Sequence, residues 1–261
     1  IPYPEGMAKL FPANSSLVFQ VHYTPVGSVQ EDVSRIGLWF TDESNVDYEV
    51  RSISAVNTEL DIPPGDGNYR AEANSRKMRT DVRLIELMPH MHLRGKAFEY
   101  EAIYPDGTTE TLLDVPAYDF NWQTGYRFVD PKPFPKGTRI HCVAHFDNSE
   151  KNLNNPNPDK RVKWGTQTWD EMLIGYFDIA IPKDQATRPS PFELRAEELI
   201  VQFDKNFDDK VERREAPLKF QIVFAQLDLD SNGELTAEEV AEAMEKYKDQ
   251  LRGRRGRQNR E

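Results

Sequence analysis

The chain has 261 residues, of which 38% are hydrophobic and 11% aromatic, so it is long enough to bury a core in one large domain or two to three small ones. Its net charge of −11 argues against nucleic acid as a partner and fits a chain that binds cations. No apolar run approaches the length of a membrane span, and a single cysteine, Cys142, excludes an internal disulfide.

The first 182 residues predict β structure, because short runs of alternating apolar and polar residues are separated by turn residues. The Asn- and Pro-rich stretch 148–160 predicts a loop, and no segment before residue 190 has a convincing helical period. We expect an all-β sandwich region. Residues 15–40 alternate as strands do, with a second short strand at 36–40. The other predicted strands are a hairpin at 97–113 around a turn at 105–107, and strands at 138–146 and 172–181.

The composition changes after residue 182. Prolines mark residues 183–191 as a linker, and from Phe192 to about Leu251 the apolar spacing becomes helical. Residues 192–251 therefore predict a small all-α domain. The final stretch, 252–261, has five Arg and one Glu and predicts a basic, disordered tail.

The strongest local signal is the twelve-residue stretch 228–239, which matches the EF-hand calcium loop. Calcium is a hard cation that takes six to eight oxygen ligands. Gly233 permits the sharp turn at position 6, and Leu235 at position 8 suits the short strand that pairs two such loops. The oxygens expected at positions 1, 3, 5, 7 and 12 come from Asp228, Asp230, Asn232, Glu234 and Glu239.

A weaker copy of this pattern begins 24 residues earlier, over residues 204–215. It has Val211 at position 8, but Asp209 stands where glycine is expected, so we expect weaker calcium binding there. A structural partner loop that binds no calcium remains an alternative. The residues at positions 1, 3, 5, 7, 9 and 12 are Asp204, Asn206, Asp208, Lys210, Glu212 and Glu215.

A second candidate metal site is the pair His90 and His92. On an extended strand, residues i and i+2 face the same side, so both imidazoles can reach one ion. Imidazole suits copper, zinc and iron alike. Taken alone, this pair is equally compatible with two surface histidines.

Five short blocks of sequence occur in an order and spacing that resemble the type II copper, ascorbate-dependent monooxygenases. These include the peptidylglycine and dopamine β-hydroxylating enzymes and bacterial relatives in which such a module joins redox or cytochrome domains. The resemblance covers roughly residues 10–182 and implies a jelly-roll-like β-sandwich. It implies that 1–45 is the C-terminal remnant of a first copper domain and 46–182 is the oxygen-binding copper domain. The blocks are 17–23, 62–65, 90–95, 142–143 and 170–172.

The resemblance implies that the oxygen-binding copper takes His90, His92 and Met172 as ligands. A thioether favours Cu(I), the state that binds O₂. The resemblance also places His22 as one of the three histidines of a second, electron-transferring copper. With only five histidines in the chain, we expect one tight copper and no coupled turnover by this chain alone.

Tyr176 matches a residue that contacts substrate in the peptide-hydroxylating relatives. Met88 and Ile174 stand where those relatives have an Arg and an Asn, so we expect the substrate to be something other than a glycine-extended peptide. His141 and His145 have no counterpart in the family, and we interpret them as structural histidines with satisfied hydrogen bonds. Trp122 and Tyr126 are interpreted as core and loop packing.

The expected function is therefore a copper-dependent monooxygenase that uses O₂, a C–H substrate and ascorbate or another one-electron donor, with calcium bound by the EF-hands. A copper- and calcium-binding interaction module without turnover is the alternative. A zinc hydrolase is disfavoured, because Met172 is not a ligand that zinc hydrolases use. The start at Ile1, without Met or a signal pattern, predicts a longer precursor with an upstream redox or copper domain, located in the periplasm or secreted.

Overall fold

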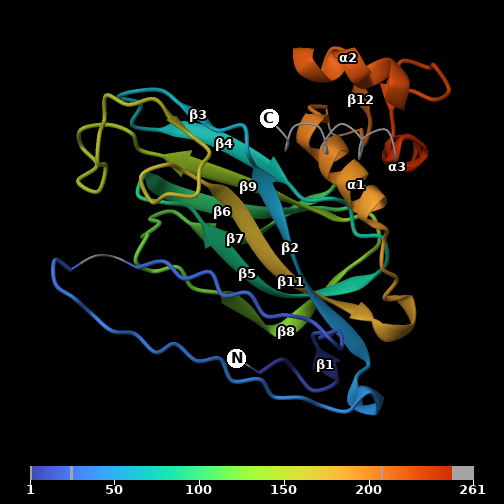
Figure 1. The fold of residues 1–261 in the computed structure, drawn as a ribbon, viewed down its shortest axis with the longest axis horizontal. Helices are drawn as coiled ribbons and strands as arrows, with labels where there is room; N and C mark the ends of the chain where they lie inside the picture. The colour runs from blue at the N-terminus through green and yellow to red at the C-terminus, as the bar shows by residue number, and fades with distance from the viewer. Residues whose placement is uncertain (1, 24–25, 207, 249–261) are drawn as a thin grey trace, which may run out of the picture.

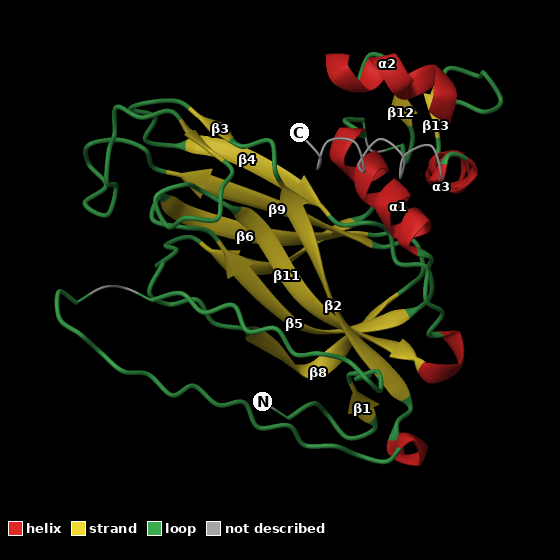
Figure 2. Ribbon diagram, viewed as in Figure 1, coloured by secondary structure: helices red, strands yellow, loops and turns green. Residues whose placement is uncertain are grey.

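A computed structural model describes residues 2–23, 26–206 and 208–248. The fold is mainly β up to residue 182, and three α-helices follow, as Figures 1 and 2 show. Within the described part of the chain, no helix combines the length and the apolar character needed to cross a bilayer.

The larger sheet has the strand order β1-β2-β11-β5-β8. All its pairings are antiparallel except that of β1 with β2, which joins the N-terminal residues to this sheet across the expected boundary at residue 45. Side chains alternate between its faces: in β5, Leu87 is buried while Met88 and His90 point outward and are partly exposed. The strands are β1 (Met7–Ala8), β2 (Tyr48–Asn57), β5 (Val82–His90), β8 (Tyr126–Phe134) and β11 (Leu173–Pro182).

The second sheet is antiparallel, with the order β4-β9-β6-β7. The predicted hairpin is confirmed as β6 and β7, and Gly107 in its turn has a φ of 84°, which glycine adopts without steric cost. The predicted strands at 138–146 and 172–181 are confirmed as β9 and β11. The bounds are β4 (Tyr69–Asn74), β6 (Gly95–Ile103), β7 (Thr109–Val115), β9 (Arg139–Phe146), and the separate pair β3 (Asp61–Ile62) with β10 (Val162–Lys163).

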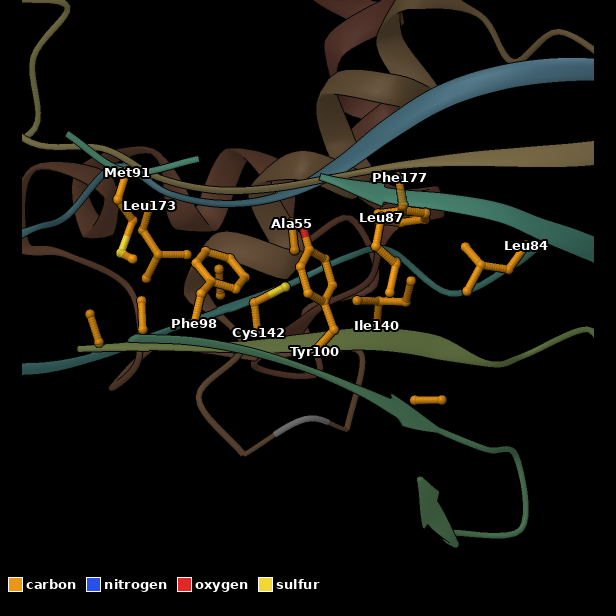
Figure 3. Packing of buried hydrophobic residues seen from close by; sticks show 14 of the residues in the cluster. Ala55, Leu84, Leu87, Met91, Phe98, Tyr100, Ile140, Cys142, Leu173 and Phe177 are labelled. Carbon is orange, nitrogen blue, oxygen red and sulfur yellow. The ribbon is translucent and has the colours of Figure 1, made fainter. Parts of the chain in front are cut away.

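The core lies between the two sheets, where Phe98, Tyr100 and Cys142 meet Leu173 and Phe177 (Figure 3). All five side chains are at most 2% exposed. Burying a side chain the size of phenylalanine stabilises the fold by about 2 kcal/mol relative to leaving it in water. Backbone pairing holds β11 against β5 in the larger sheet, and the candidate metal ligands lie at one end of that strand pair.

The prediction of strands within 15–40 is wrong. In the described residues of that stretch the backbone forms no strand, and its apolar side chains lie in solvent, with Val18 90% and Trp39 92% exposed. Alternation alone does not make a strand, because the backbone N–H and C=O groups need a neighbouring strand to bond. Figure 1 shows the described part of this segment, in blue, as a long loop outside the two sheets.

The C-terminal region alternates helices with two loops that are joined by a short antiparallel pair. Val211 pairs with Leu235, so position 8 of one loop meets position 8 of the other, as the sequence predicted. Residues 249–261, which include the predicted tail and the end of the predicted all-α domain, lie outside the described residues. The elements are α1 (Pro191–Phe203), β12 (Val211–Glu212), α2 (Leu218–Leu227), β13 (Glu234–Leu235) and α3 (Ala237–Lys246), and two 3-10 turns precede them at Glu43–Asn45 and Lys183–Gln185.

Candidate functional site

His90 ends β5, and His92 follows it after one residue. Their ring centroids are 5.3 Å apart and the rings are perpendicular. Nδ1 of His90 lies 2.6 Å from Oε1 of Gln123, and Nδ1 of His92 lies 3.2 Å from the carbonyl oxygen of Asp170. A partner that accepts from Nδ1–H leaves the Nε2 lone pair for a metal, which is the usual way protein structures orient histidine ligands.

Burial lowers the pKa of both histidines. Desolvation is the main cause for each, and it outweighs the opposing hydrogen bonds of His90 with Gln123 and of His92 with the Asp170 carbonyl. Both rings are therefore neutral at pH 7, the form that binds metal ions.

Met172 comes directly before β11. In the antiparallel register Ile174 pairs with His90, so Met172, two residues earlier, follows the same face toward His92. Its side chain is partly buried. The strand pairing thus brings the three predicted copper ligands to one end of the larger sheet.

A buried carboxylate fixes the turn that carries the two histidines. Glu171, fully buried, accepts the backbone N–H of His92 at 2.9 Å and that of Arg94 at 2.7 Å. Arg94 is itself fully buried, and its guanidinium donates to Oδ1 of Asn148 at 2.8 Å and to the Trp169 carbonyl at 3.0 Å. Since Glu171 adjoins Met172, this network ties the histidine turn to the strand that carries the methionine.

Burial raises the pKa of Glu171 to about 7, from an ordinary 4.5, even though the amides of Arg94 and His92 and the charge of Arg94 lower it. A carboxyl with a raised pKa holds its proton more tightly when folded, so its contribution to stability is complete below pH 4.5 and is lost as the pH rises through 7. We expect the unfolding free energy of metal-free protein to fall by up to about 3 kcal/mol between pH 5 and 8 from this group.

The check is urea denaturation of wild type and Glu171→Gln in chelator at both pH values. Histidines that titrate in this range act equally in both proteins, so the difference between the two isolates Glu171. A Glu171→Gln variant that keeps the full wild-type pH dependence would contradict this assignment.

Tyr176 lies beside the histidines on the outer face of the sheet. Its ring centroid is 6.1 Å from that of His90, and it pairs with Met88 across the strands. Both side chains line a cavity of about 480 Å³, together with two ion-paired couples, Lys9 with Asp178 and Arg127 with Glu86. The predicted substrate residue therefore borders a hollow next to the candidate metal ligands.

Two sequence interpretations are wrong, for Trp122 and for His145, while that of His141 is confirmed. Trp122 is 69% exposed and lines a second cavity of about 220 Å³ with Tyr118 and Tyr126, so it does not belong to the core. His141 is buried and satisfied by Asn74, 3.0 Å from its Nδ1, but Nδ1 of His145 is buried without a hydrogen-bond partner among the described residues. The sequence did not reveal which side chains lie next to Trp122 and His145 in the fold.

His22 is exposed, and it is close enough to His90 to add to the lowering of the pKa of His90, of which burial is the main cause and which the hydrogen bond with Gln123 opposes. Among the described residues, it belongs to no cluster of three or more His, Cys, Asp or Glu side chains. The expected second copper site therefore has one ligand in the part of the chain that the structure covers.

In the loop 228–239, ligand atoms of Asp228, Asp230 and Glu239 lie within 4.8 Å of one another. The carboxylate of Asp228 accepts the N–H groups of Asn232 at 3.0 Å and Gly233 at 3.1 Å, which curls the loop around the point where these oxygens meet. Gly233 has a φ of 88°, as position 6 requires. The oxygen donors fit a hard cation such as calcium.

The loop 204–215 has a related shape with fewer converging carboxylates. Asp204 and Glu215 are both buried and point into the loop, where they accept backbone N–H groups of Asp209 at 2.8 Å and Glu212 at 2.9 Å. Lys210, at position 7, bonds Glu234 of the other loop. Among the described residues, no three carboxylates of this loop come within 4.8 Å of one another, as those of the loop 228–239 do.

Sequence reasoning missed Gln123, Glu171 and Arg94, the residues that position the histidine turn. Glu171 stands in the Asp170-Glu171-Met172 block, so its neighbourhood was visible, but its role was not. Gln123 bonds His90, 33 residues away in sequence, and Arg94 bonds Asn148, 54 residues away. No local sequence pattern predicts contacts over such separations.

No protein-family model matches the chain, and no curated protein matches it. Similar solved structures include that of infectious bursal disease virus Gt strain, with a TM-score of 0.29 and 12% identity over 58% of this chain and 37% of that chain. T=1 particles derived from the same virus have a TM-score of 0.27 and 13% identity, over 62% and 37%. The chain thus spans little more than a third of these proteins, and so low a likeness carries no argument.

Proposed function

We propose that the chain is the oxygen-binding copper part of a monooxygenase resembling the type II copper, ascorbate-dependent enzymes, on a jelly-roll-like β-sandwich. One observation carries the proposal: His90 and His92, both neutral and both held through Nδ1, share one end of a strand pair with Met172. Two imidazoles and a thioether suit Cu(I) better than zinc. When bound there, copper supplies the activation of O₂ for C–H hydroxylation.

The chain's own residues supply geometry. Gln123 and the Asp170 carbonyl hold the histidine rings, and Glu171 holds the backbone between His92 and Arg94. The substrate is proposed to bind in the cavity beside Tyr176, where its C–H bond would face the metal ligands.

The proposal is tested by ascorbate-dependent oxygen uptake coupled to a hydroxylated product, measured on the full-length precursor. A protein that binds copper but consumes oxygen without product would support the alternative, a metal-binding interaction module. We propose an upstream redox or copper domain as partner, since His22 alone cannot hold the electron-transferring copper. We also propose a periplasmic or secreted location.

We expect the 261-residue chain to bind one copper tightly, because one imidazole at His22 gives too few ligands for a second. A copper titration with a competing chelator measures the stoichiometry. Two tight equivalents, the second lost in His22→Ala, would show that residues near His22 complete another site.

We expect no efficient turnover of glycine-extended peptides. The cavity presents Met88 and Tyr176, while both cations that line it, Lys9 and Arg127, are paired with carboxylates. A peptide carboxylate would find no unpaired arginine fork to bind it bidentately. Product analysis with the full-length precursor and a panel of such peptides checks this; rapid hydroxylation of any of them would refute it.

We also propose that the C-terminal helices form an EF-hand pair that binds calcium, more tightly at 228–239 than at 204–215. The converging oxygens of Asp228, Asp230 and Glu239 support the tighter site, and the paired loops support the pair.

A further inference from the structure

Position 6 is where the two candidate calcium loops differ most. Asp209 and Gly233 both have a positive φ, of 69° and 88°. A Cβ added to Gly233 would meet nothing within 4 Å, so the backbone conformation alone disfavours a side chain at this position. Asp209 therefore occupies a turn that glycine would form at less cost, and its side chain has contacts that glycine lacks.

The carboxylate of Asp209 bonds two cations of the β-sheet region. One is Lys77, in the segment between β4 and β5, and the other is Arg139, at the start of β9. The side chain of Arg139 is only 5% exposed, and a cation this buried needs a carboxylate partner. The first loop is thus held against the sheets through position 6.

Helix α1 makes a second contact with the same segment. Glu197 bonds Arg76 at 3.2 Å and Nε of Arg79 at 2.8 Å, and its side chain is 18% exposed. Figure 1 shows the three helices gathered at one end of the sheets. We call the four basic residues on the sheet side, Arg76, Lys77, Arg79 and Arg139, the basic face.

Asp209 also touches the first calcium ligand. Its backbone N–H donates to Oδ2 of Asp204 at 2.8 Å, and Asp204 occupies position 1 of the loop. One residue therefore bonds the basic face through its side chain and the leading ligand through its backbone. Holding Asp209 also holds Asp204 in the inward orientation that a cation requires.

We propose that Asp209 docks the loop 204–215 onto the basic face and that this docking preorganises the loop for calcium. The inference rests on the proposed calcium binding. A ligand site that is already ordered loses less conformational freedom on binding, so docking raises its affinity. Simple electrostatics predicts the opposite for the cations, because Lys77 should repel calcium and its removal should tighten binding.

The experiment is calorimetric titration of calcium into the full chain carrying Glu239→Ala, which isolates the loop 204–215. Asp209→Asn keeps the shape and tolerates a positive φ but removes the charge. Lys77→Gln removes the other half of the contact, and both side chains are over 40% exposed, so the variants should fold. Asp209→Asn is expected to weaken calcium binding about ten-fold and Lys77→Gln by less, because the contact with Arg139 remains. The double variant should bind no more weakly than Asp209→Asn, which already lacks the contact with Lys77.

Lys136→Gln is the matched control. Lys136 is an exposed lysine of the same β region, and its backbone N–H bonds Asp81 rather than Asp209. The control variant should leave the affinity unchanged. If Lys77→Gln tightens binding or has no effect, or if the losses of the two variants add, the proposal is overturned while the calcium site stands.

If the loop 204–215 binds no calcium in wild type or in Glu239→Ala, its proposed calcium binding is refuted. The proposed effect of docking on calcium affinity is then refuted as well. Docking itself has a separate readout: trypsin should cleave after Lys205, an exposed residue of the loop, faster in calcium-free Asp209→Asn than in wild type. Equal cleavage rates would overturn the docking.

Discussion

Replacing Met172 with alanine is expected to remove the sulfur shell from the X-ray absorption spectrum of the Cu(I)-loaded chain. Wild type should show mixed nitrogen and sulfur ligation, from two imidazoles and one thioether. Losing an outer-shell partner already costs about 10–100-fold in metal affinity, so losing a ligand should lower the Cu(I) affinity by at least about 100-fold. A competition titration with a Cu(I) chelator measures that loss.

Met88→Ala is the matched control, because Met88 lies on the same face of the sheet, two residues before His90. It should keep the copper–sulfur shell and the affinity. A sulfur shell that survives in Met172→Ala and disappears in Met88→Ala would show that the ligand is Met88 and that the assignment to Met172 is wrong. A shell lost in neither variant would show that the sulfur comes from a residue other than Met172 and Met88.

Replacing Glu239 is expected to abolish the tighter calcium step, because position 12 supplies two of the oxygens around the ion. Glu239 also forms the capping box of α3 with Thr236, so Glu239→Ala removes a helix cap worth about 1 kcal/mol as well. Glu239→Gln keeps that capping pattern and removes the charge. We expect calorimetry to show the tighter step lost in both variants.

Glu238→Ala provides the control at the neighbouring position, where the side chain is exposed and is not among the three carboxylates that converge in the described residues. It should retain the tighter step. Titration curves of Glu239→Gln that superimpose on those of wild type would refute a calcium site at 228–239.

The local features were predictable because a few adjacent residues determine them. The hairpin around Gly107 follows from turn chemistry, and the loop at 228–239 follows from the spacing of short oxygen donors around Gly233. The shared face of His90 and His92 required only the period of a strand. The pairing of Val211 with Leu235 was also readable, since both occupy the same position of a repeated motif.

Tertiary structure decided what depends on distant partners. Residues 15–40 alternate like a strand, yet their described part has no neighbouring strand to bond, so the alternation has no structural effect. Glu171 holds the histidine turn only because folding brings its carboxylate within hydrogen-bonding distance of the backbone N–H groups of His92 and Arg94. Asp209 looked like a defect in a calcium loop until Lys77 and Arg139, 132 and 70 residues away, met its carboxylate. The physical reason is common to all three: a hydrogen bond or ion pair needs both partners, and sequence shows only one of them at a time.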